Sequence, residues 1–156
     1  GQDAVVVQRM RTAGLLHDIG KVAIPQSLLN KPGRLTTEEF AKLMTHPVVG
    51  WEICKPLRTA QSVLDCILYH HERFDGCGYP HGLAGEDIPY QARLLAVADA
   101  LDALTSERAY RRSLSVAEAV ELLGHETDSG KWDPEIFAAL TRLADRGQAD
   151  PRRLEL

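Results

Sequence analysis

The sequence lacks any apolar run that approaches the roughly 20 residues needed to cross a bilayer, and no secretory signal peptide opens it. Hydrophobic residues make up 44% and charged residues 26% of the 156 residues. This is the composition of a soluble globular protein, long enough for one domain with its own core. We therefore expect no membrane contact by this segment and a cytoplasmic location.

The chain has only three cysteines, Cys54, Cys66 and Cys77, without CxxC spacing. An odd, widely spaced set indicates a reducing intracellular compartment rather than a disulfide framework. The chain also lacks excess positive charge. Its net charge of −4 argues against DNA as a partner. A small anionic substrate stays possible, because a local basic cluster can act inside an acidic protein.

No segment alternates with period two for long enough to form a sheet, so we expect an all-α protein. Capping boxes at Thr36/Glu39 and Ser115/Glu118 mark two helix starts, and Asp133 followed by a proline marks another. Gly124 is expected to end the helix that begins near 115. The expected helices cover 5–16, 36–44, 47–53, 62–70, 90–105, 115–124 and 134–147, with loops at 22–35 (containing one turn at most) and 75–83.

Two pairs of adjacent metal-binding residues stand at expected helix ends: His17 with Asp18, and His70 with His71. Neighbouring side chains on a helix point about 100° apart, so such a pair can grip one ion only at a terminus. Gly20 supplies that terminus for the first pair. A carboxylate there can bridge two cations, which an imidazole nitrogen cannot do.

Asp99 lies in an apolar run, where a carboxylate is costly unless it is paired or metal-bound. Mixed imidazole and carboxylate ligands suit iron, manganese or zinc better than calcium. An isolated HD dipeptide is common by chance, and His46 before a proline could equally be a helix cap. We expect His81 and His125 at the surface.

The chain resembles the HD-GYP family, a branch of the HD phosphohydrolases, over roughly residues 12 to 140. The resemblance rests on many short motifs in the family's order. They are Leu15–Lys21 (LLHDIGK), Ala23–Pro25, Leu29–Gly33 (LNKPG), His46–Pro47 with Gly50, His70–Glu72, Asp75–Gly76, Gly78–Pro80 (GYP), Gly82–Leu83, Ala98–Ser106 and Arg108–Arg111.

The resemblance implies a helical bundle of the HD-domain type, with an additional C-terminal helical part and a Gly-rich GYP loop. It also implies two or three divalent transition-metal ions, of which iron or manganese is expected. The implied metal ligands are His17, Asp18, His46, His70, His71 and Asp99, with Asp18 bridging. Asp18, Lys21 and Asp99 are the implied catalytic residues, and Lys21, Gly78, Tyr79, Asp102, Arg108 and Arg111 the implied substrate-binding residues.

The implied activity is hydrolysis of cyclic di-GMP to linear pGpG, with onward cleavage to GMP left open. Two alternatives remain: another nucleotide substrate, or a non-catalytic module that binds the dinucleotide or a partner protein. The arginines near 108–112 could also be a solvated surface run, and Tyr79 an ordinary turn residue.

One departure from the family concerns the start of the chain. Family members carry a further metal-binding histidine upstream, whereas the sixteen residues before His17 contain neither His nor Glu. We therefore expect residues 1–156 to be a single HD-GYP domain cut from a longer signalling protein. A regulatory or sensory domain is expected upstream, and a diguanylate-cyclase-type protein as a further partner. The ion that His17 and Asp99 hold should then be the weaker one.

Overall fold

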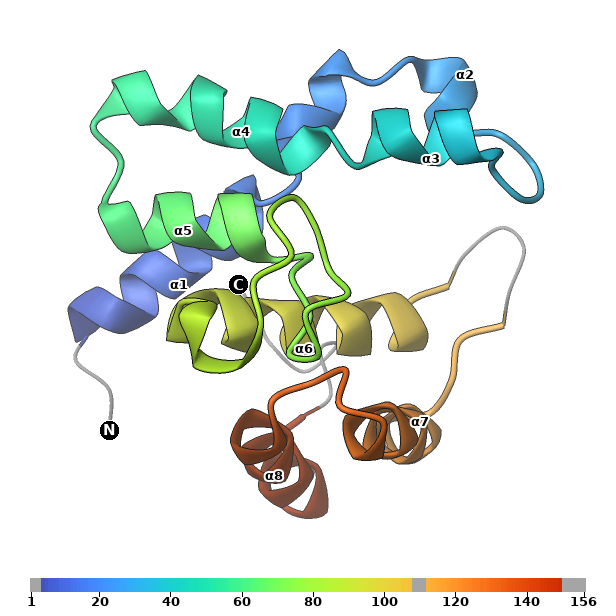
Figure 1. Cartoon of the computed structure of the whole chain (residues 1–156). Coiled ribbons are helices and arrows are strands. Elements are labelled where there is room, and N and C mark those ends of the chain that lie inside the picture. Colours follow the sequence, from blue (N-terminus) through green and yellow to red (C-terminus); the bar gives the residue numbers. More distant parts are fainter. Residues whose placement is uncertain (1–3, 108–111, 150–156) are drawn as a thin grey trace.

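The computed structural model describes residues 4–107 and 112–149, and within these ranges every regular element is a helix. The all-α prediction is confirmed. None of the described helices is long and apolar enough to cross a membrane. The elements, shown in Figure 1, are α1 (Ala4–Leu16), η1 (Ile19–Ala23), α2 (Gln26–Leu29), α3 (Thr37–Leu43), α4 (His46–Cys54), η2 (Lys55–Leu57), α5 (Gln61–Tyr69), η3 (Gly85–Asp87), α6 (Tyr90–Thr105), α7 (Val116–Asp128) and α8 (Pro134–Asp145).

The three expected helix starts are confirmed by side chains that pair with otherwise unbonded backbone N–H groups. Thr36 and Glu39 form a reciprocal capping box before α3, and Ser115 and Glu118 form another before α7. The carboxylate of Asp133 accepts hydrogen bonds from two N–H groups in the first turn of α8. Local capping chemistry therefore sets these boundaries.

One predicted boundary is wrong. Helix α7 passes through Gly124 and ends at Asp128. A Cβ at Gly124 would lie 3.3 Å from the ring of Phe137 on α8. The missing side chain thus lets α7 and α8 pack closely, and the glycine serves packing rather than helix termination.

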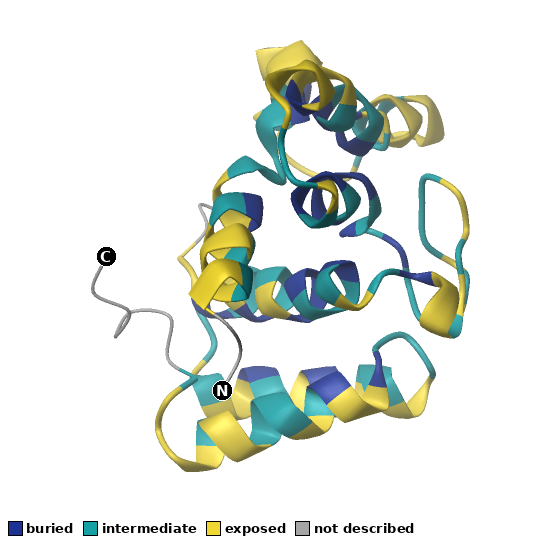
Figure 2. Cartoon of the chain, turned by 90° about the vertical axis from the view of Figure 1, so that its left-hand side faces the viewer, coloured by how far each residue is buried: buried dark blue, intermediate teal, exposed yellow. Residues whose placement is uncertain are grey.

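The main core lies between α1, α4, α5 and α6, which turn their buried faces toward one another (Figure 2). Its buried residues are Ala13, Cys54, Val63, Leu64, Cys66, Ile67 and Leu95. Burial raises the pKa of the Cys66 thiol to about 12, so this cysteine is a protonated packing residue. Cys77, by contrast, is exposed.

Helices α7 and α8 pack below α6 and form a second core around Leu101, Ala119 and Leu123 (Figure 1). An ion pair of 2.5 Å between Arg93 of α6 and Asp133 ties this part to the first. Because Asp133 also caps α8, the pair anchors the start of that helix. Helix α6 therefore carries one side of both cores.

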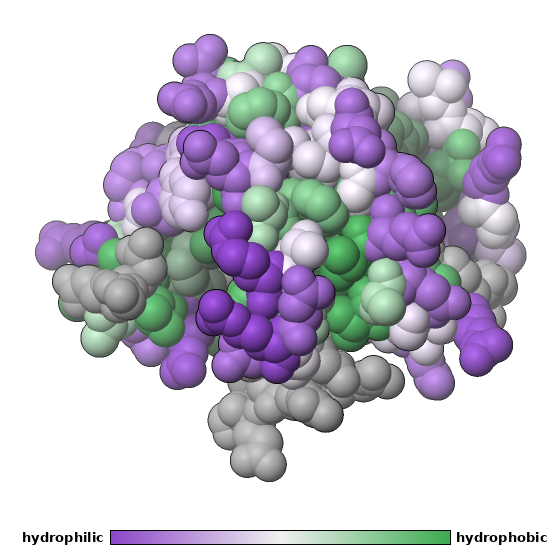
Figure 3. Space-filling view, turned by 90° about the horizontal axis from the view of Figure 1, so that it is seen from below, coloured by the Kyte–Doolittle hydropathy of each residue, from purple (hydrophilic) through white to green (hydrophobic). Residues whose placement is uncertain are grey.

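An apolar groove of about 700 Å³ separates α1 from the first half of α6, and another of about 400 Å³ separates α6 from α8. Leu94 and Ala98 line both grooves. The view from below shows hydrophobic side chains exposed between polar ones (Figure 3).

Gly20 lets η1 lie directly against α4. A Cβ there would sit 1.9 Å from the carbonyl oxygen of His46 and 2.6 Å from the amide nitrogen of Gly50. Any larger residue must push the two backbones apart. The glycine thereby brings Asp18, two residues earlier, close to His46.

We predict that Gly20→Ala lowers the free energy of unfolding by at least about 3 kcal/mol, because the new methyl overlaps backbone atoms that cannot move alone. Gly14→Ala is the matched control. Gly14 lies in α1, and a methyl group added there would meet nothing within 4 Å, so alanine should raise stability by about 0.5–1 kcal/mol. Urea denaturation of both variants checks this, and equal midpoints would contradict the close approach.

Candidate metal centre

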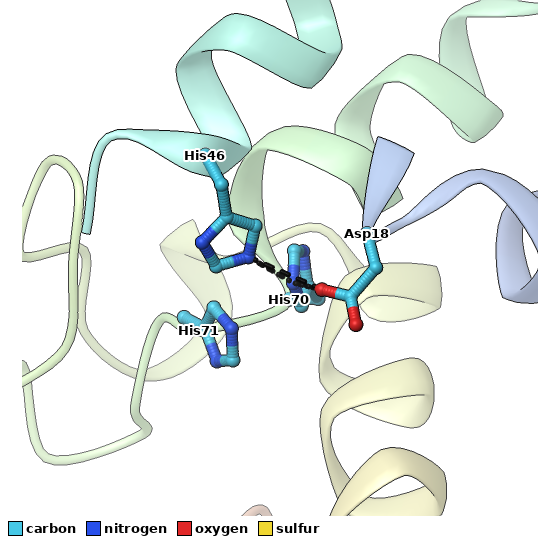
Figure 4. Close-up of side chains that lie close together, drawn as sticks. All are labelled: Asp18, His46, His70 and His71. Carbon is cyan, nitrogen blue, oxygen red and sulfur yellow. Dashed lines mark hydrogen bonds and ion pairs between the residues drawn. The ribbon is translucent and has the colours of Figure 1, made fainter. Parts of the chain in front are cut away.

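Helix ends bring most of the predicted ligands to one point. His17 and Asp18 follow α1, His46 opens α4, and His70 and His71 follow α5. One ligand atom each from Asp18, His46, His70 and His71 lies within 4.8 Å of the others (Figure 4). The structure thus assembles residues that lie far apart in the sequence, as expected for a metal site.

The same kind of hydrogen bond orients three of the histidine rings. In His17, His46 and His70, Nδ1 bonds the backbone carbonyl oxygen three residues earlier, at 2.7, 2.8 and 2.9 Å. The carbonyl can only accept, so Nδ1 carries the proton in each ring. In its neutral form each of these rings presents the lone pair of Nε2 to the centre, and this is the form that binds a metal ion.

Asp18 lies between two sets of donors and turns one oxygen to each. Its Oδ1 is 3.3 Å from Nε2 of His46 and 3.9 Å from Nε2 of His70. Its Oδ2 is 3.5 Å from Nε2 of His17 and 2.5 Å from Nζ of Lys21. A carboxylate in this position can contribute an oxygen to each of two donor sets, and its bridging of two ions stays a prediction.

The donor set on the His46 side fits a cation. Nε2 of His46 lies 3.3 Å from Nε2 of His70, and with both Nδ1 atoms protonated neither Nε2 has a hydrogen to share. Asp18 Oδ1 is buried beside them without a hydrogen bond. Facing lone pairs and an unpaired buried carboxylate oxygen are costly unless a positive charge lies between them.

The pKa values of His70, His71 and Asp18 also favour a cation at this position. Burial and the neighbouring imidazoles lower the pKa of His70 to about 4 and that of His71 to about 3. Both rings are therefore neutral near pH 7. Burial opposes ionisation of Asp18, but the Lys21 ammonium beside Oδ2 helps to hold the pKa of that carboxyl well below its usual range.

A second donor set forms around His17. Its Nε2 is 3.7 Å from Oδ1 of Asp99, which α6 supplies. Burial alone would lower the pKa of His17, but Asp99 and Asp18 outweigh it and raise that pKa. The contact with His17 in turn lowers the pKa of Asp99. His17, Asp18 and Asp99 can hold a second ion, and weaker binding there stays a prediction.

Glu72 is a residue whose role the sequence did not reveal. Its carboxylate is buried, 2% exposed, and accepts N–H bonds from His81 at 2.7 Å and from Gly82 and Leu83 at 3.1 Å. It therefore anchors the Gly-rich loop next to His71. A charged residue between a histidine pair and a glycine-rich loop was the available signal.

Gly78 and Tyr79 place that loop against His71, one of the predicted metal ligands. A Cβ at Gly78 would lie close to the amide nitrogen of Arg73, at 2.4 Å, so only glycine permits the close approach. The ring of Tyr79 then stacks on His71, with centroids 4.8 Å apart and 28° between the planes. Burial, and the charges of Asp18 and Asp99, raise the pKa of Tyr79, which keeps its phenol protonated.

The other predicted site residues differ in placement. Lys21 contacts the cluster through Asp18. Asp102 is exposed, and its Oδ1 accepts a 3.3 Å hydrogen bond from the hydroxyl of Ser106. Arg108 and Arg111 lie outside the described residues, so their roles stay predictions. His81 and His125 are exposed, as expected.

Comparisons with known proteins agree with this geometry. The family model of the HD domain matches residues 1–136. The chain belongs to the HD domain family. A solved structure described as an HDG"Y"P protein from Bdellovibrio bacteriovorus superposes with a TM-score of 0.73 at 26% identity, over 92% of this chain and 45% of that one. The resemblance to the HD-GYP branch is thus confirmed.

Curated relatives are named as phosphodiesterases. A cyclic di-GMP phosphodiesterase of Pseudomonas aeruginosa is 44% identical over 88% of this chain and 33% of its own length. One from Thermotoga maritima is 40% identical over 92% and 39%. A 3'3'-cGAMP-specific phosphodiesterase of Vibrio cholerae is 34% identical over 91% and 33%. The chain spans little more than a third of these relatives.

We predict that Asp18→Ala strips more metal from the purified protein than His46→Ala, because a bridging carboxylate serves two ions and an imidazole only one. Elemental analysis of the variants after dialysis measures this. Asp65→Ala is the control, since Asp65 lies on α5 and pairs with Gln61. Wild-type metal content in Asp18→Ala would rule out the bridging role.

Proposed function

We propose that this chain is a metal-dependent phosphodiesterase domain that hydrolyses cyclic di-GMP to linear pGpG. The observation that carries the proposal is the position of Asp18, with one oxygen toward His46 and His70 and the other toward His17 and Lys21. Such a paired centre suits phosphodiester hydrolysis, in which charge develops on both the attacking and the leaving oxygen.

The mixed imidazole and carboxylate donors suit iron, manganese or zinc. The resemblance to the HD-GYP family implies iron or manganese and two ions, with a third left open. Bound there, such ions would supply a hydroxide near neutral pH and stabilise the negative charge that forms on the phosphate. Asp18 contributes to both donor sets, and Asp99 completes the one around His17. The histidines contribute neutral nitrogens held in place by backbone carbonyls.

Lys21 is placed to act on the substrate. Its ammonium contacts Asp18 Oδ2 and its side chain is 38% exposed, so it stays accessible to a phosphate bound at the centre. As a compact point charge it can offset the charge of the scissile group. We propose that Arg108 and Arg111 hold the phosphates bidentately and that Asp102, Gly78 and Tyr79 contact the nucleoside.

The wider setting of the domain is proposed from its relatives. The chain is 41% identical to a cyclic di-GMP phosphodiesterase response regulator of Xanthomonas campestris and spans 36% of it. This supports a regulatory domain elsewhere in the protein. A diguanylate-cyclase-type protein as a further partner is proposed from the family resemblance alone. We place the activity in the cytoplasm, where this second messenger acts, and leave onward cleavage to GMP as a second step.

A second candidate substrate is 3'3'-cGAMP. Relatives named as phosphodiesterases specific for it are 34%, 35% and 44% identical to this chain. It shares the cyclic phosphate–ribose ring with cyclic di-GMP and differs in one base. The metal centre alone therefore cannot favour either substrate.

We predict that protein loaded with iron or manganese hydrolyses cyclic di-GMP. Asp18→Asn should lower turnover by more than roughly a hundredfold. Loss of a residue that only supports a metal ligand typically lowers activity by about ten- to a hundredfold, so a larger loss indicates a direct ligand. Asp65→Asn, the control, should retain full activity. Chromatography of the products with both cyclic dinucleotides measures this. A metal-loaded wild type that binds cyclic di-GMP without cleaving it would instead indicate a non-catalytic signalling module.

Arg108→Ala should weaken cyclic di-GMP binding by roughly ten- to a hundredfold, the equivalent of about 1.5–3 kcal/mol for a charge-assisted bond. Metal content should not change. Arg142→Ala, an exposed site on α8, is the matched control. Titration calorimetry measures both variants, and unchanged affinity in Arg108→Ala would show that the arginines are a solvated surface run.

A further inference from the structure

Phe40 is a large aromatic side chain left half-exposed near the metal centre. It lies on α3, a helix that buries none of its residues, and is 46% exposed. Its ring meets that of Tyr79 edge to face, with centroids 6.3 Å apart and 79° between the planes. In such a contact, at least one face of the Phe40 ring stays free of Tyr79.

Helix α3 holds Phe40 in a defined place despite its lack of buried residues. The capping box of Thr36 and Glu39 fixes the first turn, and Lys31, before the helix, forms a 2.6 Å ion pair with Glu39. The same pair neutralises the carboxylate immediately before Phe40. An anionic ligand therefore meets less repulsion at this ring than the acidic helix start would suggest.

The aromatic rings form a continuous series that begins at a metal ligand. His71 stacks on Tyr79, and Tyr79 contacts Phe40. A nucleoside that extends from a phosphate at the centre past Tyr79 meets the ring of Phe40 next. His71 covers one face of the Tyr79 ring. Phe40 is the ring of this series that is left half-exposed.

We propose that Phe40 is a stacking platform for a nucleobase of the substrate. The proposal rests on the proposed function and goes beyond it by assigning a base-binding residue outside the GYP loop and the arginines. A base stacked on an aromatic side chain gains affinity whichever base it is, because every base has a π face. Phe40 therefore acts on cyclic di-GMP and 3'3'-cGAMP alike and does not select between them.

The competing explanation is that Phe40 merely shields Tyr79 from water. Two substitutions separate these roles. Phe40→Leu keeps an apolar cover but removes the π face, whereas Phe40→Trp keeps an aromatic face. Leu57→Ala is the control, since Leu57 is a 70% exposed apolar residue of η2, at the far end of α4 from His46.

The experiment measures KM and kcat of the metal-loaded protein for cyclic di-GMP, 3'3'-cGAMP and methyl p-nitrophenyl phosphate, which carries no nucleobase. Phe40→Ala and Phe40→Leu should raise KM for both dinucleotides by roughly five- to a hundredfold. Turnover of the small ester should stay unchanged. Phe40→Trp and Leu57→Ala should behave as wild type.

Unchanged KM in Phe40→Leu, or a loss confined to one dinucleotide, would overturn the stacking role while leaving the proposed activity intact. A wild type that binds the dinucleotides without hydrolysis would overturn the activity alone, and dissociation constants of the same variants would then test Phe40. A wild type that neither binds nor cleaves them would overturn both.

Discussion

The hydrogen bond from a histidine Nδ1 to the carbonyl three residues earlier is the interaction on which the centre depends. His17, His46 and His70 each make it, and each lies within a residue or two of a helix end, where such a carbonyl has no further helical partner. The bond fixes ring orientation and tautomer together. The main chain thus holds these nitrogens in the form that can bind a metal ion. The buried Asp18 Oδ1, which has no hydrogen-bond partner, lies beside those of His46 and His70.

Close backbone approach is the second constraint. Gly20 sets η1 against α4, and Gly78 sets the Gly-rich loop against residues 71–73. In both places a methyl group would overlap main-chain atoms, so the distance between elements is fixed by backbone contact rather than by deformable side chains. Glu72 completes the second contact by accepting three loop N–H groups. The positions of the predicted ligands accordingly depend also on Gly20 and Glu72, which are not among those ligands.

Much of this could be predicted from the sequence. Capping boxes such as Thr36/Glu39 are local, so helix starts were readable, and the motif order indicated the ligands. The predicted helix end at Gly124 was wrong because the sequence does not distinguish a glycine inside a helix from one at its end. The reason for this glycine is its close contact with Phe137 of the neighbouring helix, which depends on tertiary packing. The burial of Glu72 likewise depends on tertiary packing, which the local sequence does not show. Which oxygen of Asp18 faces which histidine depends on how the helices that carry these residues pack together.

Helix α6 connects the predicted metal centre with the C-terminal part of the chain. It supplies Asp99 to the centre from the middle of the helix, while its other side packs on α7 and α8. The Arg93–Asp133 pair fixes that packing at the start of α8. Any displacement of α8 that breaks the pair would act on the helix that carries Asp99, less than two turns further along. The C-terminal helices thereby help to set the position of Asp99, a predicted metal ligand.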